Sequence, residues 1–447
     1  MRKNKIGFLE AFSIGVGGMV GGGIFAVLGL TITLARGAAP IAFAIAGFIA
    51  LITAYSYVKL SLRYPSAGGT IEFIVRAYGN GLFSSFVNLL MLVSYIIMLS
   101  LYAYAFGSYG SALLMGKDVV WVHDILSIGV IAFFTLINLF GAFLTGKVED
   151  LMVLLKIFIL LIFAGVGLTS IHTAHLATFE WMPFPSVVSG GLIIFLAYEG
   201  FELIANTARD IKNPKKNLPR AYYSSVIFVI ALYVLIAVVT VGNVTFQEAK
   251  NAQDYVLAKA AEPFFGQIGF VLIGIAALLS TASAINATIY GGGRTSYLIA
   301  KLGELPENFE EKIKNGYKGM LIIAFFSMLF ATLFNLDNIS VAGSIGFLIV
   351  FSLVNLANFL LYKETGANRL IAGFATLLCI AATFMLVAYN AVHSPGSLLT
   401  SGIAVGMVFV FTIFYAHFKK RKDILSLFVD KRLHKDEIEK DKELYKN

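Results

Sequence analysis

The sequence predicts an all-α membrane protein with twelve transmembrane helices, arranged as a 5+5 inverted repeat with broken helices 1 and 6 and completed by helices 11 and 12. Hydrophobic residues make up 58% of the 447 residues, and charged residues only 13%. Twelve apolar segments approach the roughly 20 residues that a helix needs to cross a bilayer. The first and sixth segments are interrupted by glycine, and paired interruptions are typical of secondary transporters built from repeats.

The twelve segments divide the chain into two comparable stretches. Their approximate bounds are 8–35, 39–62, 81–110, 122–144, 150–171, 186–207, 221–242, 265–291, 317–335, 339–362, 370–391 and 398–418. Residues 8–171 and 186–362 each hold five segments, and five is an odd number, so we expect the second repeat to be inverted. Residues 1–418 would then form one transporter domain with helices 11 and 12 at 370–418, followed by a charged cytoplasmic tail at 419–447.

The basic residues predict that both termini are cytoplasmic. With twelve spans, all but four of the 34 Lys and Arg residues lie on one side, and only Arg36, Lys117, Lys250 and Lys259 lie on the other. Lys and Arg near helix ends gather on the cytoplasmic side of a membrane. This asymmetry also explains the net charge of +8 without a nucleic acid partner. We expect an integral protein of the plasma membrane, in contact with membrane lipids.

Motifs for enzymatic or metal chemistry are absent from the sequence. The six histidines lie in loops or at helix ends, and Cys379 is the only cysteine. No HExxH motif, phosphate-binding loop or cysteine pair occurs. The sequence therefore predicts no enzyme activity, no metal site and no cofactor.

The first interruption predicts a site for a carboxylate. Six glycines fall between Gly15 and Gly23, and glycine weakens a helix by about 1 kcal/mol relative to alanine. Gly21, Gly22 and Gly23 could present unpaired N–H groups at the start of a half-helix, where the dipole also favours an anion. The alternative is that small residues allow close helix packing.

The second interruption, Phe195 to Glu202, predicts the complementary site for an amine. Unwound carbonyl groups around Phe195, Leu196, Ala197 and Gly200 could accept hydrogen bonds from an ammonium group. Together the two interruptions fit a zwitterionic substrate, and hence an amino acid.

Two acids accompany the second interruption. Glu199, Glu202 and Asn206 share one face of a regular helix. An acid at membrane depth is costly, so both need partners or protonation. Glu199 could contact the substrate amine or a cation, and Glu202 could act in gating or proton coupling. Alternatively, either acid stays protonated and joins helices through structural hydrogen bonds.

Lys156 is the basic residue that the sequence singles out. It lies five residues into the fifth segment, about 8 Å from the end of that segment at 1.5 Å per residue. Its side chain could reach the interface, or it could be a buried ammonium that carries a proton. Ser283 in the eighth segment, with Ser280, Thr281 and Asn286, could complete a polar pocket, although such side chains often bond their own helix.

Several motifs in order resemble one family of transporters. They are Val20-Gly21-Gly22-Gly23-Ile24-Phe25, Tyr64-Pro65-Ser66-Ala67-Gly68-Gly69, Ala197-Tyr198-Glu199-Gly200-Phe201-Glu202, Lys212-Asn213-Pro214 with Leu218-Pro219-Arg220, and Gly293-Arg294 through Leu305-Pro306. The chain is similar over nearly its whole length to the amino acid–polyamine–organocation (APC) superfamily with the leucine-transporter fold. This resemblance implies that the N–H groups of Gly22 and Gly23 hold the substrate carboxylate, and that carbonyls near Phe195, Leu196 and Glu199 hold its amine.

The resemblance also assigns a role to the lysine. Lys156 resembles the helix-5 lysine of proton-coupled and sodium-independent members, which implies that its ammonium lies against the carbonyls of Gly17 and Val20. We therefore expect a secondary active amino acid transporter that works by alternating access and is coupled to protons. Tyr95 and Tyr102 are candidate walls for side-chain selectivity.

Two alternatives stay open. Glu199 departs from the apolar residue found in many members, which favours a cationic amino acid or polyamine exchanger. A nutrient receptor that binds amino acids without transporting them is a remote alternative.

Overall fold

The computed structural model describes residues 6–140, 146–313 and 316–418. The predicted tail, 419–447, lies outside the described residues. The described chain is almost entirely helical, which confirms the predicted all-α fold. Its only strands, β1 (Lys312–Ile313) and β2 (Gly316–Tyr317), form a short antiparallel pair within these described ranges.

The helices follow one another along the chain with few long connections. The first part of the chain forms α1 (Phe8–Met19), α2 (Gly23–Ala35), α3 (Ala39–Arg63), α4 (Thr70–Tyr78), α5 (Leu82–Met115), α6 (Val120–Leu139) and α7 (Gly146–Gly167), then the short 3-10 helices η1 (Leu168–Ser170), η2 (Thr173–Leu176) and η3 (Thr178–Glu180). The middle forms α8 (Phe184–Ile193), η4 (Phe195–Tyr198), η5 (Phe201–Asp210), α9 (Pro214–Asn243), α10 (Phe246–Asn251), η6 (Gln253–Tyr255), α11 (Val256–Lys259) and α12 (Glu262–Lys301). The last part forms η7 (Glu307–Glu310), α13 (Lys318–Leu333), α14 (Leu336–Leu360), α15 (Tyr362–Thr365), α16 (Arg369–His393) and α17 (Pro395–Phe418).

The membrane-length helices follow the predicted segments closely. Among the described residues, nine helices are long and apolar enough to span a membrane, and two bent pairs add a span each. The pairs are α1 with α2, bent by 45°, and α8 with the 3-10 stretch Phe195–Asp210, bent by 47°. The shorter apolar helix α13 occupies the remaining predicted segment. Breaks therefore occur in helices 1 and 6 as expected, while the inverted relation between the two halves stays a prediction.

One helix is longer than the sequence predicts. The predicted segment 265–291 ends at a glycine run, but α12 continues through it to Lys301. Gly292 and Gly293 lie close against Ile323 and Met320 of α13, where a Cβ would lie 2.9 Å and 2.4 Å from those side chains. The glycines thus allow these two helices to approach each other closely.

The broken helices lie at the centre of the bundle. Almost every side chain of α2 is buried, as is the second break, whereas α16 and α17 carry exposed hydrophobic side chains such as Leu370 and Phe414. Around the centre, α12 packs along α5 and α3 packs along α9. Hydrophobic side chains on the outside and polar ones near the central breaks are the arrangement expected of a bundle in lipid.

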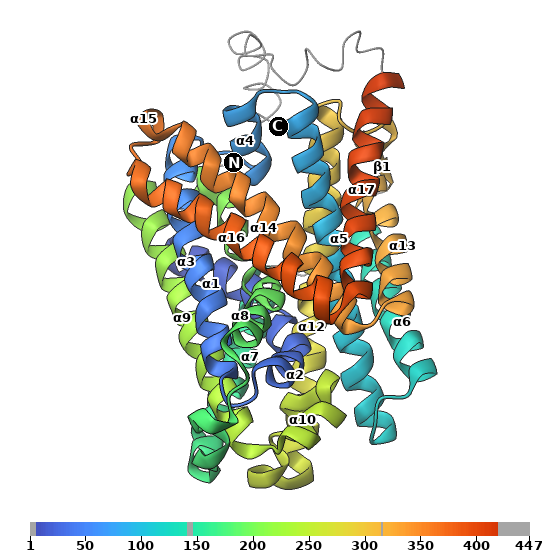
Figure 1. Ribbon diagram of the computed structural model, residues 1–447. Helices are drawn as coiled ribbons and strands as arrows, with labels where there is room; N and C mark the ends of the chain where they lie inside the picture. The colour runs from blue at the N-terminus through green and yellow to red at the C-terminus, as the bar shows by residue number, and fades with distance from the viewer. Residues whose placement is uncertain (1–5, 141–145, 314–315, 419–447) are drawn as a thin grey trace.

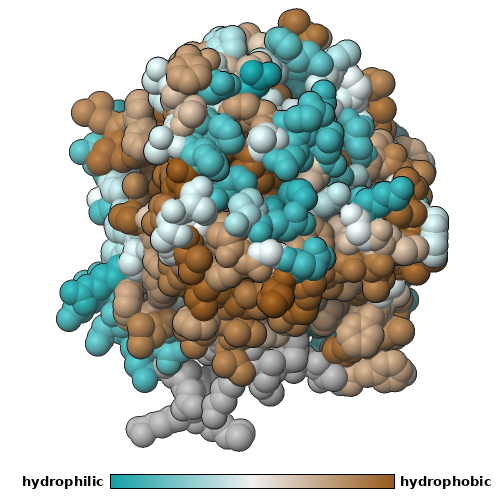
Figure 2. Space-filling model, turned by 90° about the horizontal axis from the view of Figure 1, so that it is seen from below, coloured by the Kyte–Doolittle hydropathy of each residue, from teal (hydrophilic) through white to brown (hydrophobic). Residues whose placement is uncertain are grey.

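The bundle has two ends, which we call the α4 face and the α10 face. Figure 1 shows α4 near one end and α10 at the opposite end, with α5 and α12 running between them. Trp121, at the start of α6, and Trp181, just before α8, are both partly exposed. Figure 2 looks onto the α10 face, where hydrophilic side chains gather in the upper and central part of the view and hydrophobic ones form a broad band below them.

Candidate substrate site

The first break exposes main-chain groups between two half-helices. α1 ends at Met19 and α2 begins at Gly23, and the N–H groups of Gly21 and Gly22 make no hydrogen bond within the described parts of the chain. The carbonyls at this break do have a partner, because the hydroxyl of Ser280 in α12 donates to those of Val20, at 3.1 Å, and Gly21. The break therefore keeps donors available while its acceptors are held by the neighbouring helix.

The second break is held by the side chain of Ser344, from another helix, and by its own Glu202. The hydroxyl of Ser344 in α14 donates to the carbonyl of Ile193 at 2.6 Å and accepts from the N–H of Leu196 at 3.2 Å. The carboxylate of Glu202 accepts from the N–H of Gly200 at 2.7 Å. These bonds satisfy groups that a continuous helix would have paired internally, as membrane depth requires.

The two breaks touch through their main chains. Gly200 has a φ of +121°, and a Cβ placed on it would lie 2.4 Å from the carbonyl carbon of Gly18. A Cβ on Gly18 would lie 2.8 Å from the carbonyl oxygen of Gly200. Nearby, a Cβ on Gly23 would lie 2.8 Å from the Cα of Ala197. Only glycine fits at these contacts, so the glycine content of both segments has a structural reason as well.

Tyr233 of α9 connects both breaks and was not predicted from the sequence. Its hydroxyl lies 2.7 Å from the carbonyl oxygen of Met19 and 3.3 Å from that of Ala197, and can donate to either. The side chain is fully buried. A tyrosine within an apolar segment gives no signal in the sequence, because its partners lie in two distant helices.

Replacing Tyr233 with phenylalanine is expected to destabilise the folded protein by about 1 kcal/mol, the usual net contribution of a hydrogen bond. Thermal unfolding of the purified protein in detergent measures this change. The matched control is Tyr223→Phe on the same helix, because the Tyr223 hydroxyl makes no hydrogen bond to any described residue. Equal melting temperatures for Tyr233→Phe and the control would contradict the bridging role.

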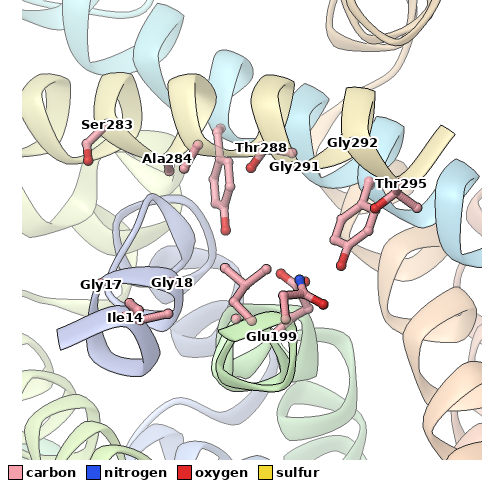
Figure 3. A pocket seen from close by; sticks show the side chains of 16 residues that line it. Ile14, Gly17, Gly18, Glu199, Ser283, Ala284, Thr288, Gly291, Gly292 and Thr295 are labelled. Atoms are coloured by element: carbon pink, nitrogen blue, oxygen red, sulfur yellow. The ribbon is translucent and has the colours of Figure 1, made fainter. Parts of the chain in front are cut away.

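A pocket opens beside the contact between the breaks. Figure 3 shows α12 along one side of it, with α1 and the residues around Glu199 on the other. The lining residues are Ile14, Gly17, Gly18, Tyr95, Tyr102, Glu199, Gly200, Leu203, Asn206, Ser283, Ala284, Ala287, Thr288, Gly291, Gly292 and Thr295. The wall combines hydroxyl, amide and carboxyl groups with apolar side chains, which suits a small polar solute.

Four of the predicted site residues line this pocket. They are Gly17, Glu199, Gly200 and Ser283, and the predicted selectivity residues Tyr95 and Tyr102 line it too. The polar wall of α12 beyond Ser283, which includes Thr288 and Thr295, was not predicted. Threonine in a membrane helix is common, so only the fold reveals which ones face the pocket.

The remaining predicted residues do not line the pocket. The ring of Tyr102 covers Gly22, where a Cβ would lie 2.5 Å from its Cδ1. Phe195, Leu196 and Ala197 are almost fully buried. The other residues of this group are Val20, Gly21, Gly23, Lys156 and Glu202.

Glu199 and Glu202 form a pair at the pocket. Both side chains are buried, and the hydroxyl of Tyr95 donates to Glu202 at 3.3 Å. Glu199 faces the pocket, while Glu202 lies behind it and fixes the N–H of Gly200.

Lys156 is buried in α7 and does not line the pocket. Only 3% of its surface is exposed. α7 packs against α1, α9 and α12. Val153, about one turn from Lys156, lies against Gly17 of α1: a Cβ placed on Gly17 would lie 2.9 Å from a methyl group of Val153. The lysine is therefore on the helix that supports α1 just before the first break.

Comparisons with known proteins match the whole transmembrane region. The amino acid permease family model matches residues 6–416. An uncharacterized protein of Methanocaldococcus jannaschii is 37% identical over 397 residues, covering 87% of this chain and 90% of that protein. The inner membrane transport protein YbaT of Escherichia coli is 33% identical, covering 85% and 89%. The branched-chain amino acid permease BcaP of Bacillus subtilis is 23% identical, covering 81% and 82%.

Proposed function

The chain belongs to the amino acid permease family, and from that premise we propose that it is a secondary active transporter that moves amino acids across the plasma membrane by alternating access, coupled to protons. Membership of this family makes it an integral membrane transporter rather than an enzyme. The observation that carries the mechanism is the contact of two broken helices beside a polar pocket, with Gly18 against Gly200 and Glu199 on the wall.

In this proposal the substrate lies between the breaks. Its carboxylate takes the N–H groups of Gly21, Gly22 and Gly23, at the positive end of α2. Its ammonium takes Glu199 and the carbonyls of the second break. Because the ring of Tyr102 lies over Gly22, that ring must move aside when the carboxylate binds.

The proposed orientation places the α4 face in the cytoplasm and the α10 face outside, in keeping with the distribution of Lys and Arg. The pocket residues beyond the breaks, among them Ile14, Leu203 and Thr295, belong to the parts of α1, η5 and α12 that run toward the α4 face. The pocket in this structure would then face the cytoplasm, with the outer route closed.

Uptake into proteoliposomes tests the function. We expect labelled alanine to accumulate when the inside is made more alkaline than an outside near neutral pH, and collapse of the proton gradient to stop accumulation. Competition by alanine, arginine and putrescine distinguishes a neutral amino acid carrier from the cationic amino acid or polyamine exchanger that Glu199 favours. Tight binding of an amino acid without any flux would point instead to a receptor.

Replacing Glu199 with glutamine is expected to weaken amino acid binding about 10- to 150-fold, since a hydrogen bond to a charged group contributes about 1.5–3 kcal/mol. Ligand-induced thermal stabilisation of the purified protein measures this affinity. Glu307→Gln, at an exposed position in η7, is the matched control. Unchanged alanine affinity together with loss of arginine or putrescine binding would favour the exchanger.

A further inference from the structure

A second group of titratable side chains lies at the α10 face, outside the substrate pocket. The segment Gln253–Tyr255, which we call the η6 clamp, packs against α2 and α5. The hydroxyl of Tyr104 in α5 donates to the Asp254 carboxylate at 3.4 Å. The clamp thus joins the half-helix that follows the first break to the long helix beside it.

The main chain of the clamp lies directly on α2. A Cβ on Gly29 would lie 2.1 Å from the carbonyl oxygen of Gln253. The hydroxyl of Thr33 donates to the side-chain oxygen of Gln253 at 3.4 Å, and the Gln253 amide donates to Asp337 of α14 at 3.2 Å. The clamp therefore fixes α2, α5 and α14 relative to one another on the side of the breaks opposite the pocket.

An imidazole–carboxylate pair lies on the other side of Tyr104. The ring of His123 is edge-on to the Tyr104 ring, with centroids 4.2 Å apart. Its Nδ1 lies 3.2 Å from the Asp118 carboxylate, and also 3.2 Å from the Ser108 hydroxyl. The Nε2 of His123 and the second oxygen of Asp118 are buried without a hydrogen-bond partner among the described residues.

Asp254 is surrounded mainly by acidic and aromatic groups. The titratable residues that face the clamp are Tyr104 and Tyr109 of α5, Asp118 and His123 near the start of α6, Asp337 of α14, and the adjacent Tyr255 and Lys259. α2 adds none, because its sequence from Gly23 to Ala35 contains no titratable side chain. A charge on Asp254 is therefore repelled by two carboxylates.

We propose that the η6 clamp is a proton-controlled latch on the α10 face: protonated Asp254 keeps the clamp seated on α2, α5 and α14, and loss of that proton releases it. This latch rests on the proposed function, since it regulates access to the same transport path. With the α10 face outside, external acid closes the outer route. Proton binding at the latch is separate from proton binding at Lys156.

The pH range follows from the surroundings of Asp254. Burial raises the pKa of this carboxyl from 3.8 to about 6, and Asp118 adds to the rise while His123 opposes it. Asp254 holds its proton more tightly when the clamp is seated than when the clamp is released into water. The seated clamp is therefore favoured over the released clamp as pH falls through 6 toward 4, and is disfavoured above 6. A rise of this size in the pKa changes the seated-to-released ratio roughly 100-fold.

Labelling of a buried cysteine tests the latch without any substrate. Val256→Cys places a thiol at a position that is fully buried beside the clamp. At each pH, the rate at which this thiol reacts with a membrane-impermeant maleimide is divided by the rate for the exposed Gln247→Cys variant. The ratio of the two rates removes the pH dependence of the thiol chemistry itself. Cys379, the only native cysteine, is buried. We expect this ratio to rise from pH 4.5 to pH 7.5 with a midpoint near 6.

Two further substitutions identify the titrating group. Asp254→Asn should keep the Val256→Cys thiol protected at every pH, whereas Asp124→Asn at the same face should leave the midpoint near 6. Tyr104→Phe should move the midpoint upward, because the Tyr104 hydroxyl stabilises the charged carboxylate. This shift provides a second readout if Asp254→Asn fails to fold.

The outcomes separate the latch from the proposed function. The latch is overturned, even if the protein transports amino acids, when the Val256→Cys to Gln247→Cys labelling ratio does not change with pH. A ratio that still changes with pH in Asp254→Asn overturns it as well. A pH-dependent ratio in a protein that transports no amino acid supports the latch and contradicts the function.

Discussion

Gly200→Ala is expected to abolish amino acid binding and to destabilise the protein by about 2–6 kcal/mol, the sum of backbone strain and overpacking. The backbone at Gly200 has a φ of +121°, which side chains with a Cβ rarely adopt. The new Cβ would also lie 2.4 Å from the carbonyl carbon of Gly18 and 2.6 Å from the N of Met19. The two breaks would have to separate, and the groups proposed to hold the substrate would move apart.

Thermal unfolding and alanine binding measure the two parts of this effect. The matched control is Gly402→Ala in α17, where the new Cβ meets nothing within 4 Å and the backbone φ is not positive. We expect the control to melt at or above the temperature of the parent, since alanine favours a helix. Normal alanine binding by Gly200→Ala would show that the contact between the breaks is not needed for the site.

Lys156→Met is expected to abolish the pH dependence of alanine uptake. Methionine keeps much of the side-chain length but cannot bind a proton, so it tests the charge at this buried position without leaving a large cavity. We propose that protonated Lys156 braces α1 against α7 and α12 when substrate is bound, and that its deprotonation loosens the cytoplasmic side. Uptake rates across a pH series in proteoliposomes measure the effect.

An exposed lysine provides the control for this variant. Lys363→Met, in α15, removes the same charge at an exposed position and should leave the pH profile unchanged. Lys156→Met should also leave the midpoint of Val256→Cys labelling near pH 6, because the proton of the latch is bound by Asp254 and not by Lys156. Proton-dependent uptake that persists in Lys156→Met would remove the lysine from the coupling mechanism.

The spans and both breaks could be predicted from the sequence, because hydrophobic length and glycine interruptions are local properties. The packing of the α12 glycines against Met320 and Ile323 could not, since those side chains belong to another helix. α4 was not predicted as an element, because it is short and lies in a loop between two spans.

The residues that hold the breaks were harder to predict. Tyr233 and Ser344 bond main-chain groups that are 36 to 214 and 148 to 151 positions away in the sequence, so only the fold brings them together. Lys156 and Glu199 could be singled out because a charge in an apolar segment is conspicuous. The family resemblance, rather than local pattern, supplied the role of Lys156.

The meeting of Gly18 and Gly200 has a consequence for how the pocket changes shape. Since only main-chain atoms touch there, neither side has a rotamer that could turn away to absorb movement of the other. We therefore expect α1 and η5, the cytoplasmic halves of the two interrupted spans, to tilt together as one rigid unit, rather than α1 moving alone.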